Sequence, residues 1–180
     1  MDAREPPCKA MSPKPGSEEE VIMKEIPYRE LIGTLLWASN GTRPDISYAV
    51  STIAKYTTNP GMLHWKALLG VLGYLYATQE YCIKYARNGS VVDGIDARGY
   101  SRGVLPFTTM DGFVDASYAG DVDTRRSTTG YLFKICGGSV SWQSRLQSSV
   151  ALASMEAEYM AAKCCNSRGY VAKSIITTWL

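Results

Sequence analysis

Gly112-Phe113-Val114-Asp115-Ala116-Ser117 and Met155-Glu156-Ala157-Glu158-Tyr159-Met160 are the stretches that decide the fold of the second half of the chain. The first reads as a strand that carries a carboxylate near its end, and the second reads as a helix that carries two more. Strand-like sequence punctuated by glycine lies between them. A strand carboxylate beside a helix carboxylate is an arrangement that two-metal hydrolysis requires.

Three strands are expected in this half, at residues 112–119, 129–136 and 139–145. Gly137-Gly138 supplies a turn between the last two, and the short connections predict an antiparallel meander. A helix is expected to begin near Ser154, as its N-cap, and to continue to about residue 179. Gly169 lies inside this helix and weakens it by around 1 kcal/mol relative to alanine.

The first half instead carries apolar residues at helical spacing, in three successive stripes. Asn40-Gly41 is expected to end the first helix and Thr42 to cap the second, while Asn59-Pro60-Gly61 breaks the chain before the third. Three such helices predict a small helical bundle. The positions that define the stripes are Tyr28, Leu31, Ile32, Leu35 and Leu36, then Ile46, Ala49, Val50, Ile53 and Ala54, then Leu68, Val71, Leu72 and Leu75.

The remaining segments complete an α+β organisation. Residues 1–20 are rich in proline and glutamate and predict a disordered leader. Residues 21–85 form the helical region, and the alternating Tyr81-Cys82-Ile83-Lys84-Tyr85 within it predicts a short strand. Residues 86–110, rich in glycine and charge, predict a linker before the domain at 111–180.

Composition narrows the classes of function. With 180 residues and 46% apolar content the chain can form a packed core, while its net charge of +2 does not by itself indicate nucleic-acid binding. The sequence has no apolar run long enough for a membrane span and no apolar signal core, so we expect an intracellular protein without membrane contact. Five cysteines without a C-x-x-C pair and a single histidine argue against zinc and for free thiols.

Six motifs, taken together, resemble one family. In this order and at these spacings they resemble the Pol polyprotein of copia-type LTR retrotransposons, from the end of the reverse transcriptase into the RNase H domain, over residues 21–162. The motifs are Tyr28-Arg29-Glu30-Leu31-Ile32-Gly33-Thr34-Leu35-Leu36-Trp37, Thr42-Arg43-Pro44-Asp45-Ile46, Asn59-Pro60 with His64-Trp65-Lys66-Ala67, Arg125-Arg126-Ser127-Thr128-Thr129-Gly130-Tyr131, Ser141-Trp142 and Glu156-Ala157-Glu158-Tyr159-Met160.

The resemblance implies a helical region like the reverse transcriptase thumb and connection, followed by a truncated RNase H-like domain with a three-stranded meander and one packed helix. It implies that Asp115 and Glu158 are the catalytic acids and ligands of Mg²⁺, and that Glu156 is only their neighbour. The implied substrate is the RNA of an RNA–DNA hybrid. No Tyr-x-Asp-Asp sequence is present, so no polymerase active site is expected.

The same resemblance sets limits on activity. The family's further acids and parallel strands follow after this helix, whereas the sequence ends at Leu180. We therefore expect weak Mg²⁺ binding, no cleavage by this chain alone, and another chain that completes the sheet. The alternative is a catalytically dead module that binds nucleic acid or serves a structural or interaction role.

Several candidate residues have alternative interpretations. From the residues alone, Asp115 is typical of a turn former and Glu158 of a helix-dipole partner. Arg125 and Arg126, beside three hydroxyl side chains, indicate phosphate contacts as much as solvated turn charges. Asp121-Val122-Asp123 could be a metal pair, but a solvated turn is favoured.

Trp142 and His64 also admit two interpretations. Trp142 could stack on a base or sugar, but its position in a strand favours a role in the core beneath the meander. His64 could contact a duplex phosphate, but its place near a helix start favours local hydrogen bonds.

Overall fold

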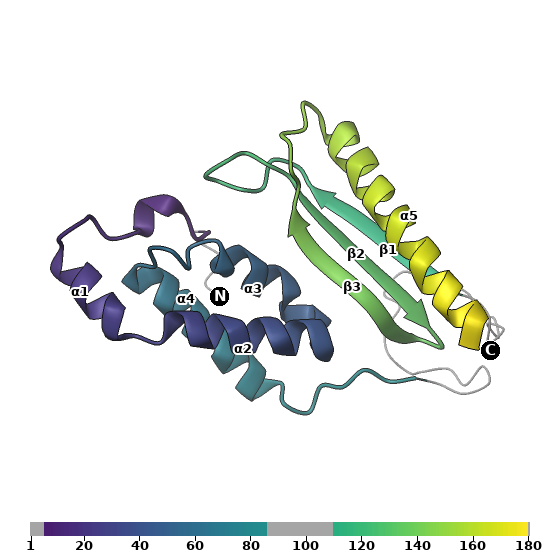
Figure 1. Ribbon diagram of the computed structural model, residues 1–180, viewed down its shortest axis with the longest axis horizontal. Coiled ribbons are helices and arrows are strands. Elements are labelled where there is room, and N and C mark those ends of the chain that lie inside the picture. The colour runs from purple at the N-terminus through teal and green to yellow at the C-terminus, as the bar shows by residue number, and fades with distance from the viewer. Residues whose placement is uncertain (1–5, 86–109, 180) are drawn as a thin grey trace.

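Helices form the first half of the chain, and a sheet with one long helix forms the second, in a computed structural model that describes residues 6–85 and 110–179 (Figure 1). The observed fold is α+β, as expected. The first half holds η1 (Lys9–Met11), α1 (Glu18–Glu25), α2 (Tyr28–Gly41), η2 (Pro44–Ile46), α3 (Ser47–Ala54) and α4 (Met62–Ala77). The second holds β1 (Met110–Ser117), β2 (Thr128–Ile135), β3 (Gly138–Leu146) and α5 (Ser154–Trp179).

The three strands form one antiparallel sheet in the order β1-β2-β3, which confirms the expected meander. The turn between β2 and β3 is Cys136-Gly137, one residue earlier than expected, and its φ angles of 51° and 78° suit the twist of a two-residue hairpin. Gly138 then starts β3. A Cβ atom there would lie 2.3 Å from the ring of Tyr85, so any other residue would require that ring to move.

The sheet lies between the helices of the first half and α5 (Figure 1). Tyr131 and Phe133 on β2 pack against Cys165 of α5 on one face. On the other face, Trp142 of β3 donates a hydrogen bond from Nε1 to the carbonyl oxygen of Ser39 at 2.7 Å. Trp142 therefore joins the sheet to α2, a role that the sequence did not indicate.

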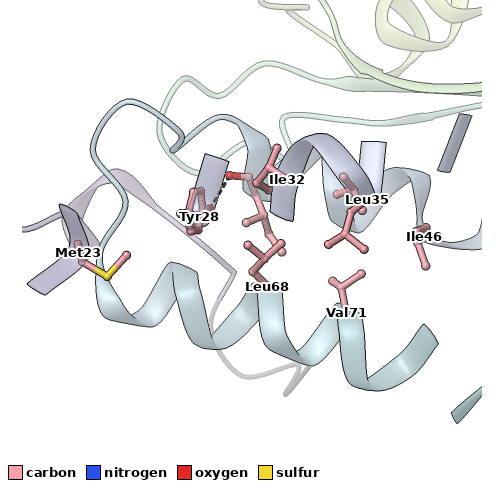
Figure 2. Close-up of a cluster of buried hydrophobic side chains, with 9 residues drawn as sticks. Met23, Tyr28, Ile32, Leu35, Ile46, Leu68 and Val71 are labelled. Carbon is pink, nitrogen blue, oxygen red and sulfur yellow. Dashed lines mark hydrogen bonds between the residues drawn. The ribbon is translucent and has the colours of Figure 1, made fainter. Parts of the chain in front are cut away.

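The larger hydrophobic core belongs to the helices (Figure 2). The phenol of Tyr28 donates a hydrogen bond to the carbonyl oxygen of Ile53 at 3.0 Å, which ties α2 to α3 inside this core. Full burial of a leucine, isoleucine or valine side chain, the commonest types in this core, stabilises a fold by about 1.5–3 kcal/mol. The core residues are Met23, Tyr28, Ile32, Leu35, Ile46, Val50, Ile53, Leu68 and Val71.

The expected disordered leader is folded against the helices over its described part, residues 6–20. Pro7 and Pro13 are buried, and their carbonyl oxygens accept hydrogen bonds from Tyr56 and Asn59 at 2.7 and 3.2 Å. Ser17 caps α1 by accepting a bond from the Glu20 amide. Composition indicated disorder, yet proline has no amide to satisfy and can pack extended chain against a preformed surface.

Other boundaries differ in smaller ways. Residues 81–85 form no strand, and most of the expected linker, residues 86–109, lies outside the described residues. Thr42 follows the end of α2 instead of capping the next helix, because Pro44 opens a 3₁₀ turn first. Helix α5 begins at Ser154 itself. No helix in the described part of the chain has the length and apolar character to cross a membrane.

Candidate functional site

Asp115 lies on β1, two residues before the strand ends, and its side chain is exposed. It is paired with Gly130 of β2. Side chains alternate between the two faces of a sheet, and Thr129 and Tyr131 lie on the face covered by α5, so Asp115 points to the opposite face. A Cβ atom at Gly130 would meet nothing within 4 Å, which leaves open space beside the carboxylate.

Glu158 lies on α5, which packs along β1 and β2. Its Oε1 accepts a hydrogen bond from the backbone amide of Ala116 at 3.3 Å, although the side chain is otherwise exposed. β1 is an edge strand, and its outer amides have no partner strand among the described residues. The helix carboxylate therefore reaches the free edge of β1 at the residue that directly follows Asp115.

The structure thus brings the two predicted acids to the same place on the edge of β1, from opposite faces of the sheet. They do not share an enclosed cavity. Two open grooves of about 300 and 390 Å³ lie elsewhere, where the end of α2, residues 81–85 and the start of β3 meet, and neither is lined by Asp115 or Glu158. The candidate site is an exposed strand edge.

The carboxylates of Asp115 and Glu158 can be compared with the ligands that Mg²⁺ prefers. Mg²⁺ binds oxygen ligands, commonly one or two carboxylates with several retained waters, so both side chains are of the right chemical type. They approach the edge of β1 from opposite faces of the sheet, however, so the structure does not direct both carboxylates at one point. No group of three or more His, Cys, Asp or Glu side chains that could hold a metal occurs within residues 6–85 and 110–179. The described residues do not provide the ligands of a two-metal centre.

Glu156, the other acid of the motif, has a local role. Its Oε2 accepts a hydrogen bond from the amide of Leu152 at 2.7 Å, at the start of α5. An acid in the first turn of a helix also interacts favourably with the helix dipole. Glu156 therefore stabilises the helix start, on a different side of α5 from the contact between Glu158 and β1.

Arg125 and Arg126 lie in the loop that joins β1 to β2, close to the strand end that carries Asp115. Arg125 is exposed and Arg126 is half-buried. Neither guanidinium takes part in an ion pair with another described residue.

The expected solvated turn is correct for the exposed Asp123 and wrong for Asp121, which is buried. Asp121 is only 5% exposed and forms an ion pair with Lys55, the residue that follows α3. Asp123 accepts hydrogen bonds from the Tyr56 phenol and the Lys9 amide, both at 2.8 Å. The two acids fasten the loop to the helices, a role for which the sequence carried no signal except the turn-forming Asp-x-x-Thr spacing.

The contacts between the β1–β2 loop and the helices also determine the ionisation of Asp121 and Tyr56. Burial opposes the charge of Asp121, but the Lys55 ammonium and the hydroxyl and amide of Thr124 outweigh it, so the pKa of the Asp121 carboxyl lies below its ordinary value. Burial and the neighbouring Asp123 raise the pKa of the Tyr56 phenol. Asp121 is therefore ionised and Tyr56 is neutral at physiological pH.

Sequence comparison places these features among known proteins. The chain is 39% identical over 145 residues to the retrovirus-related Pol polyprotein from transposon TNT 1-94 of Nicotiana tabacum, which covers 81% of this chain and 10% of that protein. It is 34% identical over 132 residues to the retrovirus-related Pol polyprotein from transposon RE2 of Arabidopsis thaliana, which covers 73% and 8%.

A third relative is of similar size to this chain. It is the secreted RxLR effector protein 161 of Plasmopara viticola, 41% identical over 139 residues, which are 77% of this chain and 86% of that protein. No protein-family model and no solved structure matches the chain.

The identities extend over about three quarters of the chain or more, whereas the chain spans only about a tenth of the length of the two Pol polyproteins. The chain belongs to the family of retrovirus-related Pol polyproteins of copia-type transposons.

Proposed function

We propose that this chain is the part of a retrotransposon polyprotein that joins the end of a reverse transcriptase to an RNase H-like unit. The helical region at residues 21–85 would grip a template–primer duplex, and residues 110–179 would act on the RNA strand of an RNA–DNA hybrid. The observation that carries the proposal is the hydrogen bond from the Ala116 amide to Glu158, which brings the acid of α5 to the edge of β1 at the residue after Asp115.

In this proposal, Asp115 and Glu158 hold one hydrated Mg²⁺. The bound ion would supply an activated water and would stabilise the leaving oxygen of the phosphodiester. Asp115 is open to solvent beside Gly130, so an ion and a phosphate can approach it without displacing a side chain. The Ala116 amide fixes one oxygen of Glu158 and leaves the other free to bind the ion.

Asp115 and Glu158 are only two carboxylates, and no described group of three or more acids, histidines or cysteines adds the ligands of a two-metal centre. We therefore propose that this chain alone binds the hybrid without cleaving it at an appreciable rate. The outer edge of β1 is open to a further strand, and we propose that another chain pairs there and completes the sheet.

Hybrid binding under increasing salt tests the substrate class. Binding through phosphate contacts weakens steeply with salt, and the slope reports the number of contacts. The double substitution Arg125→Ala with Arg126→Ala is expected to lower that slope by about one for each arginine that contacts phosphate. Binding that does not respond to salt would instead favour a structural or interaction module.

Cleavage assays in Mg²⁺ test the chemistry separately. We expect no hybrid cleavage by the chain above the level of the Asp115→Asn variant. The control is addition of a catalytically complete RNase H to the same hybrid, which shows that the substrate can be cut. Robust cutting that depends on Asp115 would overturn the proposal that the chain alone is inactive.

A further inference from the structure

The loop between β1 and β2, residues 118–127, is held by hydrogen bonds between its own backbone groups. The Arg125 amide donates a hydrogen bond to the Asp121 carbonyl oxygen at 2.8 Å, and the Asp121 amide donates to the Arg126 carbonyl oxygen at 3.1 Å. Arg125 has a φ of 55°, which is strained for a side chain other than glycine. Surrounding contacts must therefore hold the loop in the conformation that presents the two arginines.

The side chain of Asp121 supplies those contacts. Its Oδ2 accepts hydrogen bonds from the amide of Thr124, at 3.2 Å, and from the Thr124 hydroxyl. Its Oδ1 accepts a hydrogen bond from the Lys55 ammonium, and the pair also forms a salt bridge. Because Asp121 is almost fully buried, its charge has to be paired, and Lys55 is the cation that pairs it.

A second acid attaches the same loop to the same part of the helices. Asp123 accepts bonds from Tyr56, the neighbour of Lys55, and from Lys9 near the N-terminus. The loop extends from the sheet toward the helices (Figure 1). The positions of the two arginines are therefore set by both halves of the molecule.

We propose that Asp121 and Lys55 are positioning residues for the phosphate contacts of Arg125 and Arg126. Asp121 fixes the turn that carries the arginines, and Lys55 neutralises the acid that would otherwise attract them away from a ligand. The inference rests on the proposed function, since it concerns how the loop engages the backbone of an RNA–DNA hybrid.

Hybrid affinity and its salt slope test the inference, measured on the whole chain for the Asp121→Asn and Lys55→Met variants. Each is expected to weaken binding about tenfold and to lower the salt slope toward that of the Arg125→Ala, Arg126→Ala variant. The Lys55→Arg variant keeps the cation and should retain both. The matched control is Ser17→Ala, which removes the N-cap of α1 outside the proposed duplex-binding region and should lower the melting temperature without changing the slope.

The outcomes separate this inference from the proposed function. If the double arginine variant has an unchanged slope, the arginine contact of the proposed function is wrong. If that variant lowers the slope but folded Asp121→Asn and Lys55→Met do not, the positioning role is overturned. If those two fail to fold, Thr124→Val, which removes one bond to Asp121 and keeps the ion pair, decides the matter: a smaller loss supports the inference and an unchanged slope overturns it.

Discussion

His64 is the single histidine of the chain, and it is fully buried where the N-terminal segment crosses the start of α4. Its Nδ1 accepts a hydrogen bond from the Gly61 amide at 3.0 Å, so its Nε2 carries the proton and donates to the Cys8 carbonyl oxygen at 3.0 Å. The ring also stacks on Tyr56, with 4.2 Å between centroids. The expected local hydrogen bond is confirmed by the Gly61 contact. The bond to Cys8 in the N-terminal segment was not predicted.

Acid is therefore expected to destabilise the fold before most carboxylates titrate. Burial lowers the pKa of His64 below its ordinary value, despite the carbonyl of Cys8 and the acids Asp123 and Glu19. The unfolded chain then binds a proton that the folded chain excludes, so the stabilisation is complete above about pH 6.5 and is lost as pH falls below it. Urea unfolding at pH 7.5 and 5.5 should show a lower free energy of unfolding at pH 5.5. A His64→Gln variant that loses as much stability between the two pH values as the parent would contradict this origin.

Gly61 tests whether the N-terminal segment is docked. A Cβ atom there would lie 2.0 Å from the Met11 carbonyl oxygen, which is backbone and cannot rotate away. Gly61→Ala is expected to destabilise the protein by about 1–3 kcal/mol, measured by urea denaturation. The matched control is Gly70→Ala inside α4, where nothing lies within 4 Å and alanine should stabilise by up to about 1 kcal/mol. Equal effects at the two positions would mean that the segment does not pack on Gly61.

At the scale of elements, the two halves of the molecule differ in the size of their separate hydrophobic clusters. Among the described side chains, which on α5 are those up to Gly169, nine buried residues join α1, α2, η2, α3 and α4, whereas Tyr131, Phe133 and Cys165 form the buried cluster between the sheet and α5. Local opening costs less free energy where fewer apolar contacts are broken. Native-state hydrogen exchange should therefore show higher opening free energies for α2 and α4 than for β1 and α5. Equal values throughout would indicate a single cooperative unit.

Periodicity in the sequence was enough to find most elements. The stripes that predicted three helices and the alternation that predicted three strands all correspond to observed elements, within a few residues. The alternating residues 81–85 are the exception. Their apolar and aromatic side chains approach β3 through contacts such as the bond from the Tyr85 phenol to the Ser139 carbonyl oxygen at 2.7 Å, and not through a backbone ladder. Tyr81 and Tyr85 remain exposed, so alternation in this segment corresponds neither to a strand nor to a buried face.

At the scale of the whole molecule, the contacts that join the two halves were not predictable. Asp121 and Lys55 are 66 positions apart, and nothing near Asp121 in sequence indicates that the lysine at the end of α3 meets it. The candidate site was partly predictable, because a strand acid and a helix acid follow from local pattern. That Asp115 and Glu158 reach the edge of β1 from opposite faces depends on strand register, which only the folded chain defines.

The central claim is that Asp115 and Glu158 hold one Mg²⁺ at the edge of β1. The most direct test is a Mg²⁺ titration of isotope-labelled protein, followed through the backbone amide of Ala116, which donates to Glu158. The account predicts a saturable shift of this signal and of its neighbour Asp115, lost in both Asp115→Asn and Glu158→Gln. An Ala116 signal that does not respond to Mg²⁺, or that responds equally in both variants, would contradict it.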